Sequence, residues 1–166
     1  TILLDEMEAK VRERLGSSVY GSDKDTLGGV VAAGLKAKGM RIAIGETFTG
    51  GQIARALADG TQGDSVLAGM EVSLDAVTLA RDLGLELSDV NAESAGTIAK
   101  ALREHYRAAA GLAVFEGSGP EPMLYTVLST ADGTQIDERT PRRDQDYGVP
   151  WTVNTAMNMV RLWLEG

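Results

Sequence analysis

The stretch Arg41-Ile42-Ala43-Ile44-Gly45-Glu46, followed by Thr47-Phe48-Thr49-Gly50-Gly51, decides the fold class. Its first half is short, apolar and β-branched, which predicts a buried strand. The second half is a tight turn with two glycines, after which Ile53, Ala54 and Leu57 recur at helical spacing. A strand, a glycine-containing turn and a helix form the opening of a βαβ unit. We therefore expect an α/β fold with parallel strands.

The rest of the chain alternates between predicted helices and strands. Amphipathic periodicity predicts helices at Ile2–Leu15, after a cap at Asp25 or Thr26, at Ala76–Leu83, at Asn91–Tyr106, and at the end, with Pro150 near the start of the last one. Further strands are expected at Val66–Val72, Leu112–Phe115, Met123–Leu128 and Gln135–Arg139, the last two joined by an Asp132-Gly133 hairpin turn. This order predicts a three-layer α/β/α sandwich with a mixed sheet, a parallel centre and an antiparallel edge hairpin.

Composition excludes several classes of protein. The chain has 166 residues and is 43% hydrophobic, enough for one well-packed domain. It has no Cys and one His, His105, which excludes disulfides, thiolate metal sites and His-rich metal sites. A net charge of -8 argues against direct nucleic-acid binding, and no apolar run approaches the length of a membrane span. We expect a cytoplasmic protein without a metal or cofactor and without membrane contact.

Two predicted strands end in small turns, Thr47–Gly51 and Glu116–Gly119. In open α/β sheets, ligands bind beyond the carboxyl ends of the strands. The first turn offers the hydroxyls of Thr47 and Thr49 and the amides of Gly50 and Gly51 at a helix start, which would stabilise a phosphate or carboxylate. The simpler interpretation, which the spacing alone favours, is a tight turn in which Thr49 is an ordinary N-cap.

The stretch Glu46–Gly51, after an Ile-Ala-Ile strand, resembles the E-S-x-T-G-G motif of the CinA C-terminal domain family. Tyr20-Gly21 and Asp25–Leu27 are similar to the linker that enters that domain. Gly69–Gly84 falls where the family has G-G-V-V-x-Y-S-x-x-x-K-x-x-x-L-G, and Phe115–Pro120 falls where it has T-G-x-A-G-P. The resemblance covers nearly the whole chain.

That family includes nicotinamide-nucleotide amidohydrolases, which convert nicotinamide mononucleotide into nicotinate mononucleotide and ammonia, and its name ties it to competence and DNA damage. The resemblance implies a pyridine mononucleotide ligand, a homodimer and an N-terminal CinA-type domain in cis. Because the chain begins with Thr, we expect residues 1–22 to be a linker helix and loop from a longer protein, and residues 23–166 to be the CinA-like domain.

The chain departs from the family pattern at the positions that would take part in catalysis. Thr47 replaces the Ser that is the family's presumed nucleophile, and Leu74 and Leu79 occupy the Tyr and Lys positions. Gln145 occupies the Arg position, next to a retained Asp144. A hydroxyl that attacks an amide needs a neighbouring base, and leucine cannot transfer a proton. The departures therefore predict a catalytically degenerate member of the family.

Three hypotheses follow. The first is a nucleotide-binding or dimerisation and scaffold module. The second is an active amidohydrolase with Thr47 as nucleophile and a carboxylate such as Glu46 or Glu116 as base. The third is an unrelated phosphate-binding α/β protein, which a flavodoxin-like strand order would indicate. The catalytic candidate is Thr47, and the candidates for nucleotide or anion binding are Glu46, Thr49, Gly50, Gly51, Gly117, Gly119 and Asp144.

Other residues favour ordinary structural roles. His105 is expected on a helix surface, since no G-x-S-x-G elbow supplies a partner nucleophile. Trp151 and Trp163 are expected in the core or at a dimer contact. Residues 142–146 carry charges of both signs and predict a solvated loop, with the edge of a nucleotide pocket as the alternative.

Overall fold

The computed structural model describes residues 5–7, 9–10, 13, 26–61, 65–144 and 147–166. Its strands are β1 (Ile42–Glu46), β2 (Leu67–Val72), β3 (Ala110–Glu116), β4 (Leu124–Ser129) and β5 (Thr134–Arg139). They form one sheet in the order β2-β1-β3-β4-β5. β1 pairs in parallel with β2 and β3, whereas β3–β4 and β4–β5 are antiparallel. The predicted mixed sheet, with a parallel centre and an antiparallel edge, is confirmed.

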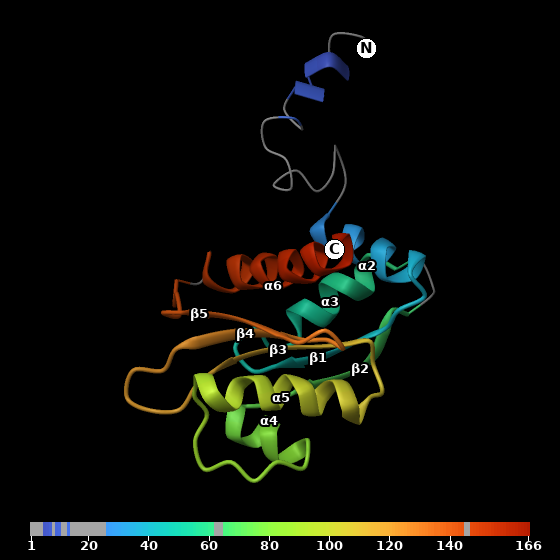
Figure 1. Ribbon diagram of the computed structural model, residues 1–166. Coiled ribbons are helices and arrows are strands. Elements are labelled where there is room, and N and C mark those ends of the chain that lie inside the picture. Colours follow the sequence, from blue (N-terminus) through green and yellow to red (C-terminus); the bar gives the residue numbers. More distant parts are fainter. Residues whose placement is uncertain (1–4, 8, 11–12, 14–25, 62–64, 145–146) are drawn as a thin grey trace.

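Helices cover both faces of this sheet (Figure 1). α2 (Leu27–Ala37), α3 (Gln52–Asp59) and α6 (Gly148–Glu165) lie over one face, and α4 (Ala76–Asp82) and α5 (Ala92–His105) lie over the other. The strands separate two hydrophobic clusters, because Ile42 and Ile44 of β1 belong to the first and Ala43 belongs to the second. Alternating side chains of a strand point to opposite faces. The three predicted layers are therefore confirmed.

The helix ends follow the expected chemistry. The hydroxyl of Thr26 accepts a hydrogen bond from the N–H of Gly29 and caps α2, as predicted. Asn91 and Ser94 form a capping box at the start of α5. In α2, a Cβ at Gly28 would lie 2.5 Å from the carbonyl oxygen of Ala56, so this glycine permits the close approach of α2 and α3.

The expectation that a flavodoxin-like strand order would indicate an unrelated fold is wrong. The strand order 2-1-3-4-5 is also that of flavodoxin-like folds, so order alone does not separate the two architectures. Strand direction does separate the two architectures, because β4 here is antiparallel to both of its neighbours. The chain joins β3, β4 and β5 by direct connections, and a parallel sheet would need crossover helices there.

The predictions for His105, for the two tryptophans and for the N-terminal helix are confirmed only in part. His105 is exposed, as expected. Trp163 packs against the core, whereas Trp151 is 37% exposed and lies under the guanidinium of Arg139, 4.4 Å from the ring centre to Cζ. Most of the predicted helix Ile2–Leu15 lies outside the described residues, and those of its residues that are described are helical. Within the described part of the chain, no helix has the length and apolarity that a membrane crossing requires.

Candidate functional site

The side chain of Glu46, the last residue of β1, is fully buried and points into the start of α3. Its Oε2 accepts hydrogen bonds from the N–H groups of Gly51 (3.0 Å) and Ile53 (3.1 Å), and its Oε1 accepts one from Ala54 (2.9 Å). The hydroxyl of Thr49 donates to Oε2 at 2.5 Å. A negative charge at a helix N-terminus is stabilised by the unpaired N–H groups and by the helix dipole. The anion at this helix start is thus supplied by the protein itself.

This arrangement corrects the expected cap. Thr49 is not the N-cap of α3, because that position is held by Gly51 in a left-handed conformation with φ of +93°. Thr49 instead uses its hydroxyl to bind Glu46 and its carbonyl to accept from the N–H of Gln52. Gly50 also has a positive φ of +60°, so both glycines of the motif satisfy a conformational need. The N–H of Gly50 has no partner among the described residues.

Thr47 extends the strand ladder by one residue, since its N–H donates to the carbonyl oxygen of Val114 at 3.0 Å. Its side chain is half-buried, and its hydroxyl makes no hydrogen bond with a described residue. Alternation along β1 directs Thr47 to the same face of the sheet as Gly45. Next to Gly45 that face is covered by methyl groups, because a Cβ at Gly45 would lie 3.4 Å from Leu79 Cδ2 and 3.2 Å from Leu102 Cδ2.

Glu116 is the last residue of β3. Alternation from Val114 directs its side chain to the face of the sheet opposite to Thr47. Its Oε2 accepts a hydrogen bond from Arg143 Nη2 at 3.2 Å, which ties the loop before α6 to this strand end. Its Oε1 is buried and has no hydrogen-bond partner. A buried carboxylate oxygen without a partner is costly, so it marks a place where a donor group would be stabilised.

The second glycine turn uses its amides within the protein. The N–H of Gly117 donates to the carbonyl of Met123 at 2.8 Å, and Ser118 exchanges hydrogen bonds with Val90. Gly119 is exposed, with φ of +113°. Asp144 is exposed and accepts from the N–H groups of Tyr147 and Gly148, which fixes the entry to α6. Ligand contacts of Gly51 or Gly117 through their N–H groups would have to replace these internal bonds.

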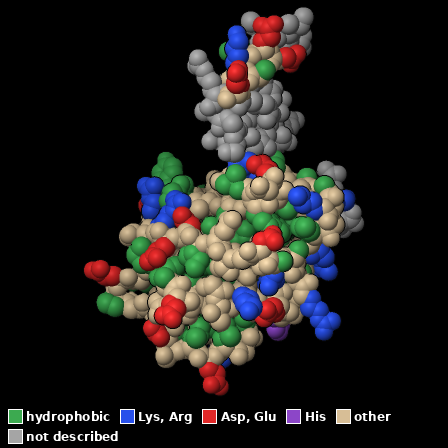
Figure 2. All heavy atoms as spheres, viewed as in Figure 1, with side chains coloured by type: hydrophobic (Ala, Val, Ile, Leu, Met, Phe, Trp, Pro, Cys, Tyr) green, Lys and Arg blue, Asp and Glu red, His purple; other side chains and the backbone are tan. Residues whose placement is uncertain are grey.

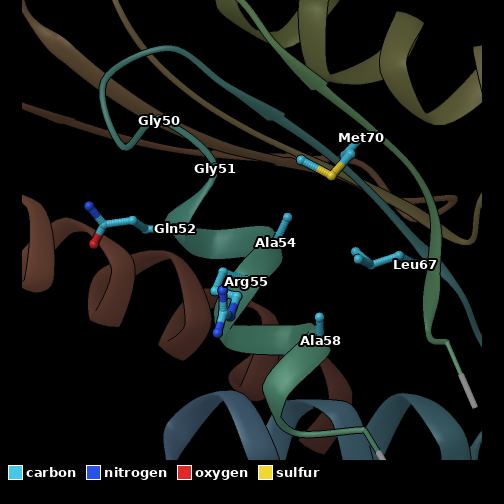
Figure 3. A pocket seen from close by; sticks show the side chains of 8 residues that line it. All are labelled: Gly50, Gly51, Gln52, Ala54, Arg55, Ala58, Leu67 and Met70. Atoms are coloured by element: carbon cyan, nitrogen blue, oxygen red, sulfur yellow. The ribbon is translucent and has the colours of Figure 1, made fainter. Parts of the chain in front are cut away.

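A groove of about 500 Å³ lies beside the glycine turn, between α3 and β2. Figure 3 shows Ala54 and Ala58 of α3 directed toward Leu67 and Met70 of β2, with Gln52 pointing away. The lining is apolar apart from Gln52 and Arg55, and neither Thr47 nor Glu116 contributes to it. This composition suits an apolar side chain of a partner better than a nucleotide.

Charges of both signs occur across the face in Figure 2. The described ion pairs are mostly short-range and exposed, such as Arg55–Asp59 and Arg142–Asp144. Among the described residues no group of three or more His, Cys, Asp and Glu side chains could hold a metal ion.

No family model matches the chain. A CinA-like protein of Anaeromyxobacter dehalogenans (strain 2CP-1) is 32% identical over an alignment that covers 94% of this chain and 43% of that protein. The chain belongs to the CinA-like family. A CinA-like protein of Frankia casuarinae is 30% identical, with 99% of this chain and 41% of that protein aligned. The chain thus spans less than half of the length of these relatives.

Solved structures agree with the fold of this CinA-like domain. A CinA superfamily protein from Klebsiella pneumoniae 700603 superposes with a TM-score of 0.67 at 20% identity, covering 84% of this chain and 96% of that one. The competence/damage inducible protein CihA from Agrobacterium tumefaciens gives 0.66 at 21% identity, covering 88% and 100%. These likenesses concern the architecture.

The structure brings together only part of the predicted site of the CinA-like domain. Glu46, Thr49 and Gly51 form one hydrogen-bonded unit with the start of α3. Gln145 lies outside the described residues. Sequence reasoning did not find the contact between Glu116 and Arg143. Their opposite charges are visible in the sequence, but residues 27 positions apart in the chain give no signal of proximity.

Proposed function

We propose that this CinA-like domain belongs to the nicotinamide mononucleotide deamidase branch of its family but is catalytically degenerate, and that it acts as a nucleotide-binding or dimerisation and scaffold module. It would act in the cytoplasm, in cis with an N-terminal CinA-type domain. The proposal joins the family membership to the replacement of the residues that would move protons during amide hydrolysis.

The observation that carries the proposal is the environment of Leu79. By resemblance, this position holds the family's lysine, the base that would activate the nucleophile. Leu79 is fully buried and packs with Leu102 over Gly45, two residues before Thr47. A base must come within hydrogen-bond reach of the hydroxyl that it deprotonates. At the matching position, the methyl groups of Leu79 cannot accept a proton.

A remnant ligand site would use three polar groups at the carboxyl ends of β1 and β3 that have no hydrogen-bond partner among the described residues. These are the hydroxyl of Thr47, the N–H of Gly50 and Oε1 of Glu116, with the guanidinium of Arg143 beside the last. All four belong to residues at the carboxyl-terminal edge of the sheet, where α/β folds bind ligands. A mononucleotide carries a phosphate for the guanidinium and N–H donors and hydroxyl groups for the carboxylate.

The test is to measure ammonia release from nicotinamide mononucleotide with the wild-type chain and with Thr47→Ala, together with calorimetric titration of the same ligand. An active family member assayed in parallel shows that the conditions permit turnover. We expect no ammonia release above that of Thr47→Ala. Turnover that disappears in Thr47→Ala would overturn the proposed loss of activity. Binding without turnover supports the nucleotide-binding role, and absence of both leaves the scaffold role alone.

A second candidate function is an active amidohydrolase with Thr47 as nucleophile. The observation in its favour is the buried Oε1 of Glu116, which has no hydrogen-bond partner among the described residues and could accept a proton. Because Glu116 ends β3 on the face opposite to Thr47, the two side chains would have to approach each other beyond the strand ends. Glu46 is the weaker base of the two, because both of its oxygens already accept hydrogen bonds. Under this alternative, Glu116→Gln abolishes ammonia release and Glu121→Gln, at an exposed position five residues further on, does not.

A further inference from the structure

We propose that two copies of this chain associate through the outer edge of β2, antiparallel to each other, about a two-fold axis that passes beside Val72. The two five-stranded sheets would then form one continuous sheet. This inference rests on the scaffold role proposed above and gives it a partner and a surface.

The β2 edge is apolar and lacks the usual protection. Met70 is 44% exposed, Val72 is 49% exposed, and Leu74, just beyond the strand, is 95% exposed. No Lys, Arg or Pro occurs between Leu67 and Leu74. The one charged residue there, Glu71, accepts a hydrogen bond from the hydroxyl of Tyr106 and is half-buried. Proteins normally blunt an open edge with charges, prolines or a covering element, so an unprotected edge indicates a pairing surface.

The other edge strand of the sheet, β5, carries the charged residues that protect an edge from pairing. β5 presents Asp137, Glu138 and Arg139 along its length, and Arg139 covers part of the adjacent surface by stacking on Trp151. Its one exposed large apolar residue is Ile136, at 44%. The contrast between the two edges identifies β2 as the one suited to association.

Backbone groups on β2 are oriented for strand addition. The N–H of Ser73 donates to the carbonyl of Glu46 in β1, so Ser73 and Glu71 turn their backbone groups inward. Because the direction alternates along a strand, the N–H and carbonyl groups of Met70 and Val72 point outward. These are the groups that an antiparallel neighbour would pair with.

The apolar side chains select the register. Pairing Val72 with Val72 of the second copy places Met70 opposite Leu74 of that copy, and Leu74 opposite its Met70. Met70 and Val72 share one face of β2, Leu74 follows just past the strand end, and Glu71 lies opposite Ser73 instead of opposite a second Glu71. Met70 also lines the groove beside α3, so the protruding Leu74 of each copy would enter the groove of the other (Figure 3). A two-fold interface requires this reciprocal fit.

Charge along β2 favours the same antiparallel partner. At the start of the strand, the guanidinium of Arg41 donates to the carbonyl of Leu67, and Arg107 lies close by, because the N–H of Ala109 donates to the carbonyl of Arg41. At the other end, Asp75 and Asp82 are exposed, and Asp82 pairs with Arg81. Antiparallel pairing sets the basic end of one copy against the acidic end of the other, which offsets the repulsion between two chains of charge -8.

Disulfide trapping tests the register directly, since the chain contains no native Cys. A two-fold axis beside Val72 brings the two Cα atoms to about 5.5 Å, within disulfide range. We expect Val72→Cys to form a cross-linked dimer at least about tenfold faster than Ile136→Cys, a matched position on the other edge. Equal rates for the two variants, or no cross-linking of Val72→Cys, would overturn the inference.

Light scattering after size-exclusion chromatography tests the same surface without cross-linking. The wild type should be a dimer, Leu74→Asp should shift it toward monomer with at least about a tenfold weaker association, and Ile136→Asp should leave the dimer intact. Circular dichroism checks that each variant is folded, as expected from the exposure of both positions. A monomeric wild type, or a dimer unaffected by Leu74→Asp, refutes the proposal. None of these measurements involves nucleotide, so their failure is distinct from failure of ligand binding.

Discussion

The N–H of Ala54 donates a hydrogen bond of 2.9 Å to Oε1 of Glu46, across the turn that joins β1 to α3. Strand and helix are therefore linked by a buried carboxylate as well as by the chain itself. Because Oε2 also accepts from Gly51, Ile53 and Thr49, the turn Thr47–Gly51 is held in one conformation around this carboxylate. The groups that face outward from the turn are set by this internal bond network.

Replacement of Glu46 should destabilise the protein severely. Glu46→Ala leaves the N–H groups of Gly51, Ile53 and Ala54 buried or half-buried without their acceptor, and each such loss costs about 1–3 kcal/mol. We expect a decrease of about 3 kcal/mol or more in the free energy of unfolding, measured by urea denaturation. Glu46→Gln keeps the shape but offers one acceptor oxygen, so it should fall between wild type and Glu46→Ala. Wild-type stability of Glu46→Ala would contradict the capping role.

Introduction of a lysine at position 79 tests how tightly that site is packed. Leu79 is fully buried beside Gly45 and Leu102, so an ammonium group there has no described acidic partner and little access to water. Leu79→Lys should lower the free energy of unfolding by at least about 3 kcal/mol. Leu79→Met, which keeps the volume and apolar character, should cost less than about 1.5 kcal/mol. A stable Leu79→Lys protein that releases ammonia would instead mean that one substitution had restored the family's base.

Local signals in the sequence were sufficient for most of the fold. The β-branched stretch before Thr47 predicted a central strand, and Gly133, with φ of +144°, does close the predicted hairpin. Asn91 caps α5, which agrees with one of the two caps, Asn91 or Ser94, that the sequence allows for this helix. These features depend on residues within a few positions of one another, which is the range over which turn and cap chemistry acts.

Features that depend on strand order could not be predicted. The pattern of Val66–Val72 predicted a strand, but only the sheet order makes β2 an edge and leaves Met70 and Val72 exposed. The capping carboxylate was missed for a related reason. Cap patterns are sought within the first turn of a helix, and Glu46 reaches α3 from the preceding strand. The sequence predicts that Glu46 binds an anion, whereas in the structure its carboxylate is itself the anion at that helix start.

Gly69 should tolerate no side chain. A Cβ there would overlap the ring of Tyr106, which packs on β2 at this point. We expect Gly69→Ala to lower the free energy of unfolding by about 1–3 kcal/mol, since the ring must move and lose its contact with Glu71. The control is Gly96→Ala in α5, where the new Cβ would lie 3.4 Å from Thr134 Cγ2. That change should be neutral or stabilise the protein by up to about 1 kcal/mol. Equal effects of the two substitutions would contradict the packing argument.

The pairing of Tyr106 with Glu71 should appear as a loss of stability at high pH. The hydrogen bond to Glu71, together with burial, raises the pKa of Tyr106 from 10.0 to about 12. A pKa that is higher in the folded state gives a contribution that is complete below pH 10 and is lost as the pH rises toward 12. Urea unfolding should therefore show that wild type loses more stability between about pH 9 and about pH 11 than Tyr106→Phe does. Tyr147→Phe, at a position that is 68% exposed, should behave like wild type. If wild type and Tyr106→Phe lose stability in parallel over this range, the hydroxyl of Tyr106 does not hold its proton through Glu71.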